Sequence, residues 1–89
     1  MQLITSNGTI LNDQEGADVL FFRVQDLNRY IEEKGLQGKI RFFRATFQDG
    51  TQELVALDVS DSQPIYSSTN YEACCIWIDM IAFAEESAI

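Results

Sequence analysis

The feature that most constrains the fold is a pair of apolar runs separated by a turn signal. Residues 39–47 (KIRFFRATF) and 51–59 (TQELVALDV) are rich in β-branched and aromatic side chains, and Asp49-Gly50 lies between them. Asp-Gly is among the strongest short-range signals for a β-hairpin, because both residues tolerate the backbone of a tight turn. We therefore predict an antiparallel hairpin over residues 39–59 with a two-residue turn.

Both faces of this predicted hairpin are substantially apolar. A two-residue turn places Phe47 opposite Gln52 and Arg41 opposite Asp58. One face then carries Ile40, Phe42, Val55, Leu57 and Val59, and the other carries Phe43, Ala45, Phe47, Leu54 and Ala56. An antiparallel sheet with one solvated face alternates cleanly between apolar and polar residues. We therefore expect the hairpin to be covered on both sides.

Two further strand elements are predicted on either side of it. Residues 3–5 and 9–11 flank Ser6-Asn7-Gly8, and the Asn-Gly pair predicts a second hairpin at the N-terminus. Pro64 breaks the pattern after residues 60–62 and favours an extended chain, so a short strand is predicted at Ile65-Tyr66.

Residues 19–34 carry two competing signals. The run VLFFRV at 19–24 has the composition of a buried strand, whereas Leu20, Val24, Leu27 and Ile31 recur at helical spacing with Asp18 as an N-cap. We expect a strand that passes into a helix over about residues 25–34, with one longer helix as the alternative. Gly35 is placed to cap the C-terminal end of this helix.

The C-terminal stretch predicts a second helix, over about residues 70–86. Thr69 is a candidate N-cap, and Glu72 three residues later completes a capping box. One side of this helix carries an ordinary core stripe that includes Trp77 and Ile81, and we expect that side to pack on the sheet. The opposite side holds Glu72, Ile76, Asp79, Phe83 and Glu86.

That opposite side is unusual, because two large apolar residues stand among three acids. Such an arrangement on a small domain indicates a contact surface rather than an ordinary solvent face. We expect a second chain to contact either this side of the helix or the far face of the sheet. The candidate interface residues are Ile76, Phe83, Asp79, Glu72, Phe43 and Phe47.

Charge is distributed unevenly along the chain of 89 residues, which has a formal net charge of −8. All basic residues lie between positions 23 and 44, and none follows Arg44. This distribution disfavours direct binding of nucleic acid or of an anionic membrane, both of which need a basic face. The acids are expected to attract a basic partner surface or to pair with the basic middle of the chain.

The residue types disfavour catalysis and cofactor binding. The chain has no histidine, the usual general base and the commonest metal ligand. Cys74 and Cys75 are adjacent in an apolar helix, where they point in different directions, and we expect small buried side chains there, with an intermolecular disulfide as the alternative. Asp13, Glu15 and Asp18 do not match the spacing of an EF-hand loop. We therefore expect no catalytic site, metal or cofactor.

These patterns predict a single α+β domain over residues 1–89. A small antiparallel sheet, built from the N-terminal hairpin and the central hairpin 39–59, packs with a middle helix at about 25–34 and an apolar C-terminal helix at about 70–86. The N-terminal segment lacks the features of a secretory signal, so a cytoplasmic location is expected. The expected function is that of a small, non-enzymatic protein-binding or regulatory module that forms a homodimer. The alternatives are a subunit of a larger hetero-assembly, or an acidic inhibitor, immunity-type or nucleic-acid-mimic protein that covers a basic site.

Overall fold

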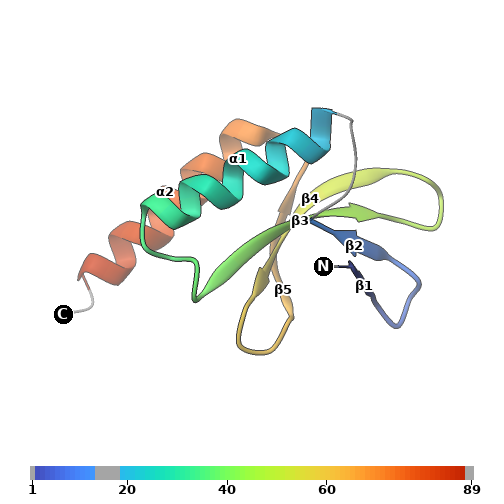
Figure 1. The fold of residues 1–89 in the computed structure, drawn as a ribbon, viewed down its shortest axis with the longest axis horizontal. Coiled ribbons are helices and arrows are strands. Elements are labelled where there is room, and N and C mark those ends of the chain that lie inside the picture. The colour runs from blue at the N-terminus through green and yellow to red at the C-terminus, as the bar shows by residue number, and fades with distance from the viewer. Residues whose placement is uncertain (1, 14–18, 88–89) are drawn as a thin grey trace.

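A computed structural model describes residues 2–13 and 19–87. Five strands and two helices follow one another in the order β1 (Gln2–Ile4), β2 (Ile10–Asn12), α1 (Val19–Glu33), β3 (Ile40–Thr46), β4 (Gln52–Asp58), β5 (Pro64–Ser68) and α2 (Tyr71–Ser87). The strands form one antiparallel sheet in the order β1-β2-β3-β4-β5. Both helices lie side by side on one face of this sheet (Figure 1). The predicted α+β fold is confirmed.

The N-terminal hairpin and the strand after Pro64 are both present. Ile4 pairs with Ile10 across the loop of residues 6–8, where Gly8 has a φ of 83° that a side chain would disfavour. The short strand predicted at Ile65-Tyr66 is β5, which forms one edge of the sheet beside β4.

The central hairpin is present, but its predicted register is wrong by one residue. Its loop spans residues 48–50 rather than two residues, because the N–H of Phe47 donates to the carbonyl of Thr51 and Gly50 adopts a φ of 87°. Arg41 therefore lies opposite Leu57, not Asp58. A one-residue slip moves every side chain of a strand to the other face. Leu54 and Ala56 accordingly share a face with Phe42, and Val55 and Leu57 share a face with Phe43.

Helix α1 begins at Val19, so the predicted strand over residues 19–24 is wrong and the single longer helix is correct. Phe21, Val24, Leu27 and Ile31 are its buried residues, whereas Val19 and Phe22 are exposed. Helical spacing of the apolar residues outweighs their β propensity here, because a helix brings Val24, Leu27 and Ile31 together into the main core. Asp18, the predicted N-cap, lies outside the described residues.

Gly35 ends α1 as predicted. It has a φ of 74°, its N–H donates to the carbonyl of Glu32, and the N–H of Leu36 donates to the carbonyl of Ile31. These two bonds define a Schellman motif, in which a left-handed glycine closes the last turn. The chain then turns at once into β3.

The main core lies between the helices and the sheet. It is formed by Val24, Leu27, Ile31, Leu36, Ile40, Phe42, Leu54, Ala56, Cys74 and Ile78. A second, smaller cluster lies on the face of the sheet that carries no helix, and consists of Leu11, Phe43, Ala45, Val55 and Leu57. Both faces of the central hairpin are thus buried, as the apolar pattern predicts.

A side chain of α1 completes the sheet where β2 is too short. The last residue of β2, Asn12, pairs with Arg44, and among residues 2–13 and 19–87 no further strand residue pairs with Phe42 on that side. Asn28 takes the place of the missing strand: its Nδ2 donates to the carbonyl of Phe42 at 3.0 Å, and the N–H of Phe42 donates to its Oδ1 at 2.8 Å. A carboxamide offers one donor and one acceptor, as a backbone peptide does. Asn28 therefore anchors α1 to β3.

We predict that Asn28→Ala lowers the free energy of unfolding by about 1–3 kcal/mol, because the buried backbone groups of Phe42 lose their partners. Chemical denaturation would measure this change. Gln25→Ala, a substitution one turn earlier on an exposed position of α1, is the matched control and should change stability little. Equal stabilities of the two variants would show that the Asn28 bonds contribute nothing.

Candidate interaction surfaces

Helix α2 begins at an N-cap one residue later than predicted. The N-cap is Asn70, whose Oδ1 accepts from the N–H of Ala73 at 3.0 Å and whose carbonyl accepts from the N–H of Cys74. The predicted cap at Thr69 is therefore wrong, in line with the stronger capping preference of asparagine. Glu72 then occupies the second helical position, where its negative charge interacts favourably with the helix dipole. It forms no capping box with Thr69, because Thr69 is not the N-cap.

The inner side of α2 packs on the sheet through Trp77, as expected. The Trp77 ring stacks on Tyr66 of β5 with a centroid distance of 4.8 Å and an interplanar angle of 9°. It also meets the Phe42 ring of β3 edge-on at 5.9 Å. Cys74 and Ile78 are fully buried beside it. These contacts hold the first half of α2 on the β5 side of the sheet.

The side of α2 that faces α1 carries polar contacts. The Tyr30 hydroxyl donates to Asp79, and the Lys34 ammonium lies 3.7 Å from the same carboxylate. Lys39, just before β3, pairs with Glu85. The basic middle of the chain thus neutralises part of its acidic C-terminal half, one of the two outcomes expected from the charge distribution. Each pair is exposed and contributes little energy, but together they orient the helix.

The outer side of α2 is apolar and exposed. Ile76, Met80 and Phe83 have exposed fractions of 61%, 64% and 70%. They occur at positions i, i+4 and i+7, so they form one line along the helix, which we call the α2 stripe. Ile76 and Phe83 were identified in the sequence, whereas Met80 was not. Met80 lies four residues after Ile76, and this helical spacing indicates that both residues share one side of α2.

Two alanines and two acids border the α2 stripe. Ala73 and Ala84 lie on the flank that points away from α1, because Tyr71 and Asp79 occupy the opposite flank and contact α1. Glu72 and Glu86 lie on the flank nearer α1 and are exposed. Among the described residues neither of these two carboxylates has an ion pair.

The remaining candidates, Phe43 and Phe47, lie on the opposite face of the sheet from the helices. Phe43 is 2% exposed, within the second cluster, and Phe47 is partly buried against that cluster. The six candidate interface residues therefore do not form one surface: Ile76, Phe83 and Glu72 lie on the outside of α2, Asp79 is turned towards α1, and Phe43 and Phe47 lie on the helix-free face of the sheet.

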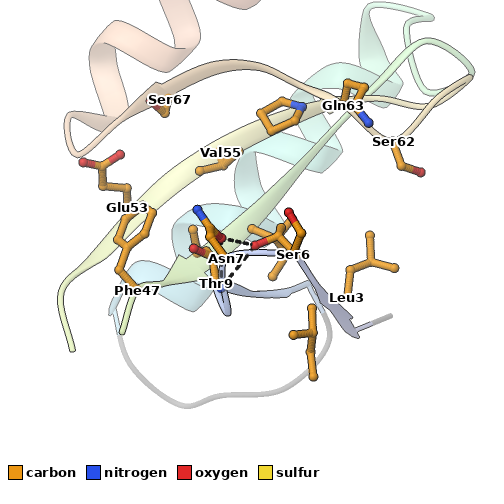
Figure 2. A pocket seen from close by; sticks show the side chains of 15 residues that line it. Leu3, Ser6, Asn7, Thr9, Phe47, Glu53, Val55, Ser62, Gln63 and Ser67 are labelled. Atoms are coloured by element: carbon orange, nitrogen blue, oxygen red, sulfur yellow. Dashed lines mark hydrogen bonds between the residues drawn. The ribbon is translucent and has the colours of Figure 1, made fainter. Parts of the chain in front are cut away.

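The helix-free face forms a groove with a volume of about 520 Å³ (Figure 2). Leu11, Ala45 and Val55 form its floor. The β1–β2 hairpin borders one side, and β5 with the loop before it borders the other. Figure 2 shows Phe47 and Glu53 next to each other at one end of this groove.

A network of short-range hydrogen bonds holds the hairpin that borders the groove. The N–H of Thr9 donates to the Thr5 hydroxyl at 3.1 Å and to Asn7 Oδ1 at 3.3 Å, and the Thr5 hydroxyl donates to the same oxygen of Asn7. The loop also folds back through the N–H of Gly8, which donates to the carbonyl of Thr5. The wall of the groove is thus fixed by the residues of the turn itself.

The buried cysteine, Cys74, is held in its unreactive, protonated form. Cys74 and Cys75 are both free, and burial raises the pKa of the Cys74 thiol to about 11. A thiol with so high a pKa stays protonated near neutral pH and is a poor nucleophile and metal ligand. Within residues 2–13 and 19–87, no group of three or more histidine, cysteine, aspartate or glutamate side chains is placed to hold a metal ion.

No protein-family model, curated protein or solved structure matches this chain. In the part of the chain that the structure describes, neither helix is long and apolar enough to cross a membrane.

The bond between α1 and α2 generates a prediction about titration. Hydrogen bonding to Asp79 raises the pKa of Tyr30 from 10.0 to about 12, because the neutral phenol donates to the carboxylate and a phenolate would be repelled by it. This contribution to stability is present below pH 10 and is lost as the pH rises through 12. We predict that Asp79→Asn shifts the Tyr30 pKa back towards 10.0.

NMR signals of the Tyr30 ring would follow this titration. Asp61→Asn is the matched control, because the Asp61 carboxylate accepts from the nearby N–H of Gln63 and does not contact Tyr30. This substitution should leave the Tyr30 pKa unchanged. A wild-type pKa that already lies near 10 would mean that the bond between the two helices does not form in solution.

Proposed function

We propose that this protein is a non-enzymatic protein-binding module that self-associates through the α2 stripe. The observation that carries this proposal is the exposure of Ile76, Met80 and Phe83, each by more than 60%, in one line on a helix that is otherwise anchored to the sheet. Single exposed apolar residues are common on monomers, but an aligned group of large ones is typical of a contact surface.

The gain from burying this surface matches the cost of forming a dimer. Burying the exposed parts of six such side chains, three from each copy, contributes on the order of 6–12 kcal/mol. Loss of translational and rotational freedom opposes association by about 4–15 kcal/mol. Since the two ranges overlap, burial of the α2 stripe offsets the cost of association, and the population of the dimer depends on protein concentration.

The layout of charge around the stripe is compatible with a second copy. A two-fold axis brings the same surface of both copies together, and when the two α2 helices run antiparallel each flank of α2 meets itself. Packing through Met80 and the alanine flank, with Ala73 and Ala84, allows close approach of two helices. Glu72 and Glu86 then remain in solvent on the flank nearer α1, which lessens the repulsion between two chains that each carry a charge of −8.

Several features support a role outside catalysis and outside direct nucleic-acid binding. The sequence has no histidine, and the Cys74 thiol is held protonated. Lys34, Lys39 and Arg41 are paired with acids of the same chain and offer no free basic face. Free thiols are usual in a reducing compartment, which supports our placement of the protein in the cytoplasm.

We predict that Ile76→Asp or Phe83→Asp weakens self-association at least about tenfold, because a carboxylate replaces a large apolar contact in both copies. Light scattering behind a sizing column, over a wide concentration range, would measure the mass. The helical circular-dichroism signal should persist, since both side chains are mostly exposed.

Phe22→Asp is the matched control, because Phe22 is a half-exposed aromatic residue on α1, away from the stripe. It should leave the association constant unchanged. A wild-type mass of one chain at every concentration would refute self-association, and equal weakening by Phe22→Asp would refute the stripe as its site.

A second candidate function is binding to a basic surface on a different protein. The unpaired carboxylates of Glu72 and Glu86 beside the α2 stripe favour it. The same sizing experiment at low and high salt separates the two functions. Self-association of two chains that each carry a charge of −8 should hold or strengthen as salt screens their repulsion, whereas a complex with a basic partner should weaken as salt rises. An inhibitor that covers a basic site would act through this second mode, whereas a subunit of a hetero-assembly would bind unlike neighbours through its apolar faces.

A further inference from the structure

The groove on the helix-free face has the shape and lining of a small-molecule site. Pockets for small ligands are typically about 300–1,000 Å³, mostly apolar, with a few polar groups at fixed positions. This groove has a volume of about 520 Å³ and an apolar floor of Leu11, Ala45 and Val55. Ser62, Gln63 and Ser67 place polar groups along one rim.

One charge dominates the lining. The groove is lined by 15 of the described residues, and Glu53 is the one among them whose side chain is charged near neutral pH. It projects from β4 to the same face as Val55 and is partly buried beside the ring of Phe47. Within the described part of the chain, no ion pair neutralises Glu53. The groove therefore presents a carboxylate next to an aromatic ring at the end of an apolar surface.

The cations of the chain are engaged away from this carboxylate. Four of the cations form ion pairs: Arg29 with Asp26, Lys34 with Asp79, Lys39 with Glu85 and Arg41 with Asp13. The guanidinium of Arg23 lies over the Tyr71 ring, and Arg44 is also engaged in an interaction. None of these acids and rings lines the groove. Among the described residues no cation therefore competes for Glu53, and its carboxylate is accessible to a cationic ligand.

We infer that the groove binds a small amphiphilic amine, with its apolar body on Leu11 and Val55 and its protonated amine between Glu53 and Phe47. A cation is attracted both to the carboxylate and to the face of the aromatic ring. An anionic ligand would be repelled by Glu53 and by the net charge of −8. A neutral ligand would leave the carboxylate without a partner. This site lies on the opposite face of the sheet from the α2 stripe, so it does not depend on self-association.

NMR titration of the full-length protein with two probes of nearly equal shape tests this inference. The probes are 3-phenylpropylamine, which is cationic at neutral pH, and 3-phenyl-1-propanol, which is neutral. At physiological salt we expect the amine to shift the backbone signals of Phe47, Glu53 and Ser67, and to bind about three- to tenfold more tightly than the alcohol. Equal affinities, or binding of neither probe at millimolar concentration, would overturn the inference.

Two variants separate the groove from general attraction of a cation to an acidic protein. Glu53→Gln should abolish the difference in affinity between amine and alcohol, whereas Glu86→Gln, the same change of charge on α2, should preserve it. Ser67→Trp should fill the groove and weaken both probes, and because Ser67 is exposed on an edge strand the fold should persist. Equal effects of Glu53→Gln and Glu86→Gln would show that the amine does not bind at Glu53.

Discussion

The structure depends on one constraint: both faces of the β3–β4 hairpin must be kept from water, and the two helices cover only one of them. Phe42, Leu54 and Ala56 are buried under α1 and α2, and Phe43, Val55 and Leu57 are buried on the other side. The chain meets this second requirement with the short N-terminal hairpin, whose Leu11 belongs to the second cluster and whose Leu3 packs against it. Because that hairpin is small, it covers the face incompletely and leaves a groove.

The position of α2 also follows from the small number of residues available to cover the sheet. Helix α1 contacts β3 and is tied to it by Asn28, so it occupies the centre of the helical face. Helix α2 is left with the β5 side, where Trp77 stacks on Tyr66. A helix at the side of a layer has neighbours on two sides only, and its outer surface stays uncovered. The sequence of α2 is apolar there as well, which distinguishes it from an ordinary amphipathic surface helix.

Prediction from the sequence succeeded where a local signal agreed with the global pattern. Asn7-Gly8 and Gly35 each mark a turn or a cap that needs a left-handed residue, and both are used in that way. Asp49-Gly50 marks the correct hairpin but not its loop length, since a glycine in this conformation also closes a three-residue loop. The one-residue difference then reversed the faces of β4. The strand expected at 19–24 failed for a related reason, because burial over a whole helix outweighed local β propensity.

The candidate interaction surfaces were likewise only partly predictable from the sequence. Ile76 and Phe83 could be identified because helical geometry alone places them on one side, away from Trp77. The groove could not be identified, because its lining comes from β1 through β5 and depends on the register of β4 and on the curl of the sheet. With the register predicted from the sequence, Glu53 would lie on the face of Phe42, under the helices. The correct register places the Glu53 carboxylate beside Phe47 instead. Glu53, for which the sequence indicates no partner, is thus the one charged side chain that lines the apolar groove.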